Sequence, residues 1–184
     1  MGLGLLISHR LLLAMTALVV VLVVGPVQAA DDDTAKAEPT GASGLGLPRF
    51  VSLKSDKVNV RKGPSTDQAI VWVFNRAGLP VEVIAESENW RRVRDSEGAD
   101  GWVLHSLLSG RRTILIAPWS KDQESVPLYT SKSASGGAAA ALEPGVLGNV
   151  SNCDGEWCQI SVDDYSGYVE QDKLWGVYKG EEIK

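Results

Sequence analysis

The sequence predicts an all-β protein made of two copies of one small β unit. From Phe50 onward, short runs rich in β-branched and aromatic residues are separated by turn-forming residues, roughly every eight to twelve positions. No segment has a helical period of sufficient length. Matching motifs also recur at a nearly constant spacing, which indicates an internal duplication.

The strands expected in the first copy follow one another closely. Val58 and Val60 alternate with polar neighbours, and Gly63-Pro64 then turns the chain, because proline fixes φ and glycine tolerates unusual backbone angles. The five extended runs are 57–61, 69–74, 81–85, 90–94 and 101–104. In the second copy, 138–142 favours a helix locally, but five residues are too few to nucleate one unaided.

The duplication rests on four pairs of motifs in the same order. Trp90-Arg91-Arg92-Val93 matches Trp157-Cys158-Gln159-Ile160 at an offset of 67 residues, and Gly101-Trp102-Val103 matches Gly167-Tyr168-Val169 at an offset of 66. The other pairs are 77–79 with 144–146 and 58–60 with 126–128. We therefore expect one domain at 50–119 and another at 120–184. Units of this size are marginally stable alone, which favours packing the copies together.

The segment before the first copy predicts export. An apolar run of 14 residues, 11–24, is shorter than the roughly 20 residues that cross a bilayer, and Gly25-Pro26 and the small Ala29 follow it. We interpret 1–29 as a signal peptide, with an uncleaved anchor as the alternative, and 30–49 as a flexible linker. The protein is then periplasmic or secreted, with no stable membrane insertion after cleavage.

Several motifs resemble a bacterial Src homology 3 (SH3) domain, and across 50–181 the chain is similar to a two-repeat family of exported proteobacterial proteins. The resemblance implies two tandem SH3-like, partly open β-barrels, a location in the cell envelope, and binding or scaffolding in place of catalysis. In the first copy it rests on 58–65, 90–93, 101–103 and Leu107-Leu108; in the second it rests mainly on Gly145, Cys153, Trp157, Cys158 and 174–178.

The same resemblance suggests where a ligand would bind. Trp90 lies in the register of the tryptophan that grips peptides in eukaryotic SH3 domains, and alternation places Arg92 and Arg94 on its face. A tryptophan that only covers the barrel is the alternative. Leu104 and Leu107 replace the proline and tyrosine of the eukaryotic family, which argues against recognition of proline motifs. The candidate ligand-binding residues are Trp90, Arg92, Arg94, Trp102, Tyr129, Trp157 and Tyr168.

Charge separates the two copies. The first carries ten basic and eight acidic residues, and the second carries five basic and eleven acidic residues. Arginine pairs bidentately with carboxylate or phosphate, so the arginine cluster could meet a wall polymer, a partner or the second copy, or it could form a solvated strand edge. A net charge of −5 argues against nucleic acid as a partner. The cluster comprises Arg91, Arg92, Arg94, Arg111 and Arg112.

The only two cysteines predict a disulfide. Cys153 and Cys158 bracket Asp154-Gly155-Glu156-Trp157, and a two-residue loop at Gly155-Glu156 would place them directly opposite each other in a hairpin. The chain-entropy model gives such a short loop about 2 kcal/mol of stabilisation. A zinc site needs four ligands, and no spacing supplies the others, so we expect no metal and no cofactor.

Catalysis has little support in the sequence. A cysteine peptidase needs a thiolate and a histidine base, and beyond the signal peptide His105 is the only histidine. We therefore expect a noncatalytic binding or scaffolding module of the cell envelope, with peptidoglycan or a wall-associated protein as its partner. The alternatives are an adaptor whose repeats pack on each other and bind a periplasmic protein, and a hydrolase with an unrecognised site.

Overall fold

A computed structural model describes Met1, residues 40–122 and residues 124–184. Both sheets of the protein belong to one compact unit, Lys36–Lys184. Apart from Met1, the expected signal peptide at 1–29 lies outside the described residues, and so does the first part of the expected linker, 30–39. No helix in the described part of the chain is long and apolar enough to cross a membrane.

The first sheet has seven strands in the order β3-β2-β6-β5-β4-β1-β7, and all neighbouring strands are antiparallel. A single 3-10 turn, η1 (His105–Leu107), joins β6 to β7. The strands are β1 (Arg49–Leu53), β2 (Val58–Arg61), β3 (Ile70–Phe74), β4 (Pro80–Ser87), β5 (Trp90–Arg94), β6 (Asp100–Leu104) and β7 (Leu108–Ser109).

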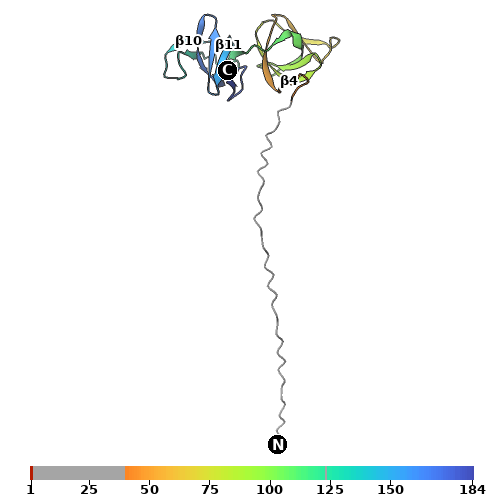
Figure 1. The fold of residues 1–184 in the computed structure, drawn as a ribbon, viewed down its shortest axis with the longest axis horizontal. Helices are drawn as coiled ribbons and strands as arrows, with labels where there is room; N and C mark the ends of the chain where they lie inside the picture. The colour runs from red at the N-terminus through yellow and green to blue at the C-terminus, as the bar shows by residue number, and fades with distance from the viewer. Residues whose placement is uncertain (2–39, 123) are drawn as a thin grey trace. The chain divides into compact units, whose positions relative to one another are not determined.

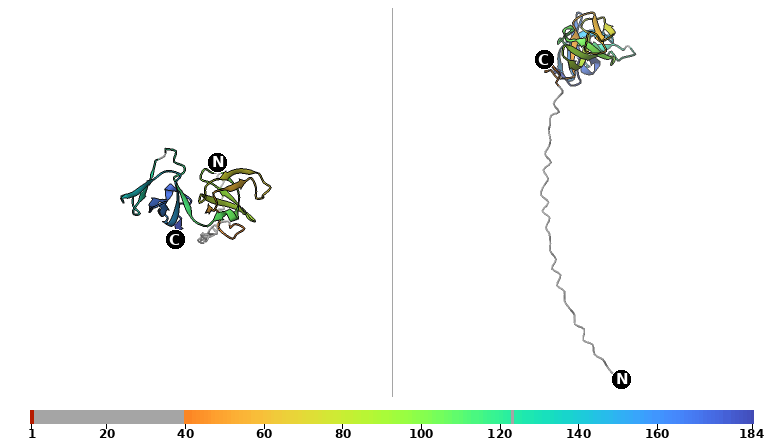
Figure 2. Two further views of the ribbon diagram at one scale, coloured as in Figure 1. Left: turned by 90° about the horizontal axis from the view of Figure 1, so that it is seen from above. Right: turned by 90° about the vertical axis from the view of Figure 1, so that its right-hand side faces the viewer.

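The second sheet repeats this path strand for strand, in the order β10-β9-β13-β12-β11-β8-β14. A 3-10 turn, η2 (Gln171–Lys173), again precedes the last strand of the path, and β15 (Glu182–Ile183) adds to β11. Figures 1 and 2 show each set of strands as a curled sheet. The other strands are β8 (Thr113–Ile116), β9 (Val126–Tyr129), β10 (Ala138–Leu142), β11 (Leu147–Asp154), β12 (Trp157–Val162), β13 (Tyr165–Glu170) and β14 (Leu174–Trp175).

The expected all-β architecture in two repeats is confirmed, but the boundary expected between residues 119 and 120 is wrong. Strand β8 lies before that boundary and pairs with β11 and β14 of the second sheet, where Leu115 faces both Leu147 and Trp175. It occupies the position that β1 has in the first sheet. β8 belongs to the second sheet because it pairs with strands that come much later in the sequence. The chain therefore passes from the first sheet to the second between Ser109 and Thr113.

The second half of the expected flexible linker packs against the first sheet instead. Thr40 and Gly46 form an isolated bridge, and the backbone and hydroxyl of Ser43 both donate to the Glu86 carboxylate, at 2.7 and 2.8 Å. Arg49 belongs to β1 and also pairs with Glu86. The Glu86 side chain is fully covered, and a buried carboxylate needs several donors, which residues 40–49 supply.

Alternation along the strands builds a core inside each sheet. On β2, Val58 and Val60 are fully buried while Asn59 is only half-buried, and on β5 the expected inward residue Val93 is also fully buried. The run 138–142 forms strand β10 and pairs with β9, because pairing partners outweigh the helix preference of a short alanine run. The first core comprises Leu53, Val58, Val60, Val81, Val83, Val93, Val103 and Leu108.

The two repeats contact each other through aromatic rings and hydrogen bonds. The Phe50 ring on β1 lies 5.0 Å from the Trp175 ring, edge to face, and 4.7 Å from the Tyr178 ring, measured between centroids. Trp175 Nε1 donates to the Pro80 carbonyl at 3.2 Å, and Thr113 Oγ1 donates to the Gly78 carbonyl at 2.7 Å. These contacts join β1 and β4 of the first repeat to the second repeat, as the marginal size of each unit leads one to expect.

Candidate ligand-binding face

The structure gives Trp90 a packing role. Its residue is only 8% exposed, and it starts β5 between Ser87 on β4 and Leu104 on β6. A side chain with so little free surface cannot stack on a ligand without moving. The alternative interpretation, a tryptophan that covers the barrel, therefore describes Trp90 better than a ligand contact does.

Arg92 and Arg94 are partly exposed, but each already binds a carboxylate of its own sheet. Arg92 Nε donates to Asp100 at 2.6 Å. Arg94 Nε donates to Glu82 at 2.9 Å, and Glu82 is only 4% exposed. Arg94 thus neutralises a buried carboxylate, which is expensive to leave unpaired.

The remaining arginines of the cluster also find partners, two of them in the second repeat. Arg91 pairs with Glu86 on β4. Arg111 donates to Asn149 on β11, and Arg112 forms a two-pronged ion pair with Glu181, at 2.7 and 2.9 Å. The sequence left open whether the arginine cluster meets a wall polymer, a partner or the second copy. Arg111 and Arg112 contact the second copy.

In the second repeat, the three predicted aromatic residues come together. Tyr129 on β9 and Tyr168 on β13 are direct cross-strand partners. The Trp157 ring on β12 lies edge to face against the Tyr129 ring, with centroids 5.7 Å apart. All three side chains are only half-buried. We call Tyr129, Trp157 and Tyr168 the aromatic cluster.

A lysine and an aspartate flank the aromatic cluster. Lys132 Nζ lies 5.9 Å from the centre of the Tyr168 ring and 2.7 Å from Asp154 Oδ2. Asp154 also accepts from the backbone N–H of Trp157 at 2.8 Å. These donors, Lys132 first, lower the pKa of Asp154, and the same ion pair raises the pKa of Lys132. The ion pair ties the loop after β9 to the end of β11.

A groove of about 250 Å³ adjoins the aromatic cluster and shares Tyr129 with it. Trp119, which is 52% exposed, forms one wall, and Pro127 contributes from β9. Glu170 and Lys173, at the two ends of η2, place a carboxylate and an ammonium at the groove. Aromatic faces beside charged groups suit a ligand with flat apolar surfaces and polar substituents.

Sequence reasoning missed Trp119 and Lys132 as members of this face. Trp119 stands at the expected end of the first domain, and Lys132 lies in a serine-rich loop. Neither position belongs to a repeated motif, and only the folded chain brings them near Tyr129 and Tyr168. A tryptophan directly after Pro118 was the one signal available in the sequence.

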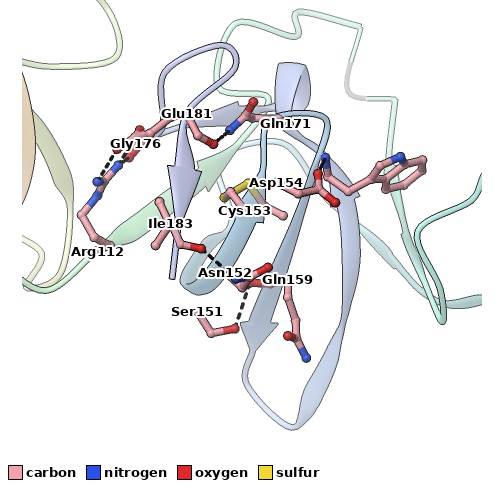
Figure 3. Close-up of a disulfide and its surroundings, with 12 residues drawn as sticks. Arg112, Ser151, Asn152, Cys153, Asp154, Gln159, Gln171, Gly176, Glu181 and Ile183 are labelled. Carbon is pink, nitrogen blue, oxygen red and sulfur yellow. Dashed lines mark hydrogen bonds and ion pairs between the residues drawn. A yellow bond between two sulfur atoms is a disulfide. The ribbon is translucent and has the colours of Figure 1, made fainter.

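The predicted disulfide is present in the β11–β12 hairpin, close to its turn. Cys153 and Cys158 are directly opposed on β11 and β12, with their Cα atoms 4.1 Å apart. Gly155 in the two-residue loop has φ of +98°, a conformation that favours glycine. Both cysteines are buried in the second core, and Figure 3 shows β15 and the Arg112–Glu181 ion pair around them.

A family model now decides what kind of domain these sheets form. The model of the bacterial SH3 domain matches residues 54–110 and again residues 122–176, together more than half of the chain. The chain belongs to the bacterial SH3 domain family. Each match lies within one sheet and its loops, so the two sheets are two bacterial SH3 domains.

Two solved structures resemble the chain at low similarity. NlpC2 from Trichomonas vaginalis has 16% sequence identity and a TM-score of 0.31, over 70% of this chain and 48% of that one. NlpC1 from the same organism has 17% identity and a TM-score of 0.32, over 73% of this chain and 48% of that one. The chain thus spans about half the length of either protein. The comparison with curated proteins found no match.

The two SH3 domains present different residues at equivalent places. In the first domain, Arg61 and Trp102 form the cross-strand pair that Tyr129 and Tyr168 form in the second. The predicted contact Trp102 is half-buried, and the guanidinium of Arg61 is used within its own loop, on the carbonyls of Thr66 and Gln68. The aromatic cluster is therefore a feature of the second domain.

No group of three or more His, Cys, Asp or Glu side chains that could hold a metal ion occurs within residues 40–122 and 124–184. His105 lies in η1, where its Nδ1 is 3.3 Å from the Asn89 carbonyl. His105 lines a cavity whose described lining residues include no cysteine, so no thiol lies beside it there as a cysteine peptidase would need.

Proposed function

We propose that this protein is an exported, noncatalytic binding module of the cell envelope, and that its second SH3 domain carries the ligand-binding face. The observation that supports this most is the aromatic cluster, which stands beside a groove with its rings half-exposed. Aromatic rings that leave part of their face open stack on sugar rings and on apolar parts of peptides.

Peptidoglycan is the ligand class that we favour, with a wall-associated protein next. Peptidoglycan combines sugar rings with short peptides that carry charged groups, and the face offers both kinds of contact. Tyr168 and Trp157 provide flat surfaces, while Glu170 and Lys173 provide one charge of each sign. The acidic balance of the second copy further favours the amino groups of such peptides over purely anionic polymers.

Co-sedimentation with purified sacculi tests the proposal. We expect the protein to pellet with sacculi at low and at physiological salt, and Tyr168→Ala to reduce the bound fraction several-fold. Tyr165→Ala is the matched control, because Tyr165 lies on the same strand, is 54% exposed and faces Val162 instead of the aromatic cluster. Failure to pellet at both salt concentrations would exclude peptidoglycan as the ligand. Equal losses of binding in the two variants would exclude the aromatic cluster as the binding site.

Export has a separate test. If 1–29 is cleaved, amino-terminal sequencing of the protein from a periplasmic fraction should begin at Ala30. A chain that retains Met1 and floats with membranes would support the uncleaved anchor instead.

An adaptor that binds a periplasmic protein is the second candidate function, and the contacts between the repeats favour it. Phe50, Trp175 and Tyr178 hold the two domains together, which suits a protein that presents a composite surface. The sacculus assay separates the two functions. An adaptor would remain in the supernatant, and a photo-crosslinker at position 168 would join it to a protein of defined mass, whereas one at position 165 would not.

A further inference from the structure

A second cavity, of about 570 Å³, opens beside β1 and shares no residue with the groove of the second domain. Its walls come from residues 43–51, from β4 and β5, and from the chain on either side of β7. The volume falls in the range of roughly 300–1,000 Å³ that small-molecule sites occupy. None of the seven candidate ligand-binding residues lines this cavity, whereas Arg91 and Arg112 of the arginine cluster do.

The ionisable side chains that line the cavity all belong to basic residues. Three arginines and a histidine contribute, and no aspartate or glutamate among the described residues does. The arginines reach the surface, with 11–23% of each side chain exposed. The four basic residues are Arg49, Arg91, Arg112 and His105.

The carboxylates behind these arginines do not cancel their charge. Arg49 and Arg91 share a single partner, Glu86, at 2.5 and 3.0 Å. Burial alone would raise the pKa of Glu86, but hydrogen bonds from Ser43 and Arg49 outweigh it and lower the pKa to about 2, so Glu86 carries one negative charge. Arg112 is balanced by Glu181. One positive charge therefore remains uncompensated, and the fully covered Glu86 side chain cannot meet a ligand.

The rest of the wall is largely apolar. Phe50 and Val83 contribute from the sheet, and Leu108 contributes from β7. Leu45 stands at the cavity with 55% of its surface exposed, although leucine is more often buried. The Ser43–Glu86 hydrogen bonds hold the neighbouring Leu45 at the mouth of the basic cavity. An apolar group bound in the cavity would cover this leucine.

We propose that this cavity binds an anionic amphiphile: a phosphate or carboxylate group joined to an apolar chain. Arginine guanidinium groups bind the anion, and Leu45 and Val51, the apolar side chains of the wall that keep exposed surface, bind the chain. Two sources share this chemistry, a lipid headgroup with its acyl chain and a soluble alkyl phosphate or fatty acid. The site is independent of the function proposed for the second domain.

Calorimetric titration of the whole protein with octyl phosphate, below its micelle-forming concentration, tests the site. We expect saturable binding that is at least about tenfold tighter than binding of inorganic phosphate or of the uncharged octyl glucoside. Equal affinity for octyl glucoside would show that charge plays no part. Equal affinity for inorganic phosphate would show that the apolar wall plays none. Absence of octyl phosphate binding would overturn the proposal outright.

Gly110 provides a matched pair of variants. It lines the cavity, and a Cβ built on it meets no atom within 4 Å, so a larger side chain there has space. Gly110→Glu adds a negative charge and should weaken octyl phosphate binding about tenfold, while the equally large Gly110→Gln should change it less than threefold. Equal effects of the two variants would overturn the electrostatic part of the proposal.

Vesicle flotation distinguishes the two sources of the ligand. Co-flotation with vesicles that contain phosphatidic acid, lost in Gly110→Glu, would identify a lipid headgroup. Binding of octyl phosphate without co-flotation would identify a soluble anion. Co-flotation that Gly110→Glu leaves intact would place membrane binding elsewhere and count against this cavity.

Discussion

The Tyr178 hydroxyl donates a hydrogen bond to Oε1 of Glu82, 3.0 Å away, although the two residues are 96 positions apart and belong to different SH3 domains. Arg94 donates to the other oxygen of the same carboxylate. Burial and the negative charge of Glu82 raise the pKa of Tyr178, which keeps the hydroxyl protonated as a donor. A buried carboxylate of one domain is thus satisfied partly by the other.

Tyr178→Phe should lower the free energy of unfolding by about 2 kcal/mol, because it removes a hydrogen bond to a charged group while keeping the ring against Phe50. Urea unfolding followed by tryptophan fluorescence measures the change. Tyr165→Phe, at an exposed tyrosine of the second domain, should change the free energy by less than about 0.5 kcal/mol. Similar losses in both variants would contradict a specific role for the Tyr178–Glu82 bond.

The aromatic contact between the domains should appear as a coupling energy. A double-mutant cycle of Phe50→Ala and Trp175→Ala should give about 1 kcal/mol of coupling, since the rings meet edge to face at 5.0 Å. The control cycle pairs Phe50→Ala with Trp72→Ala, because Trp72 contacts Phe74 within its own sheet. A coupling near zero in the first cycle would mean that the domains do not stabilise each other through these rings.

The disulfide should stabilise the second domain by about 2 kcal/mol, as expected for a bond that closes a very short loop. Replacing both cysteines with alanine should lower the urea midpoint, and reductant should lower that of the native protein towards the same value. Reductant should leave the double variant unchanged. An unaffected native protein, or free thiols found by alkylation and mass spectrometry, would contradict this prediction.

Stability should fall in acid as Glu86 becomes protonated. The pKa of Glu86 is lowered from 4.5 to about 2 in the folded protein, so its contribution is complete above pH 4.5. The contribution is lost as the pH falls from about 4.5 towards 2, because the unfolded chain then binds a proton that the folded chain does not. Urea unfolding at pH 5 and pH 2.5 measures it.

Glu86→Gln should make the pH dependence flatter between these two values, whereas Glu88→Gln, at an exposed neighbour, should not. The Glu86 variant should also loosen residues 40–49, because the carboxamide offers Ser43 and Arg49 only one acceptor oxygen and no negative charge. Faster amide exchange at Ser43 would report this. An unchanged acid transition in Glu86→Gln would assign the transition to other carboxylates.

The fold was largely readable from the residues themselves. Val58 and Val60, spaced two apart beside Gly63-Pro64, are enough to predict a strand and a turn, and Trp90 and Trp157 at an offset of 67 reveal the duplication. The Cys153–Cys158 bond was equally readable, because both cysteines lie within one hairpin and local geometry alone brings them together.

Local patterns could not determine contacts between residues that are far apart in the chain. Trp90 and Trp157 occupy equivalent positions in the repeat, yet the first is almost fully buried and the second is half-exposed, which depends on neighbours from other strands. The pairing of β8 with the second sheet and the packing of 40–49 against Glu86 also depend on contacts between residues that are far apart in the chain.

The amino-acid pattern alone therefore determined that this is a duplicated, all-β protein with one disulfide, since those properties depend on neighbouring residues and on repeated spacing. The tertiary structure decided which partners the arginines bind, which aromatic rings gather on one face and where the two domains meet. A buried carboxylate such as Glu82 or Glu86 recruits its donors through space, and the distance along the chain has no influence on which donors those are.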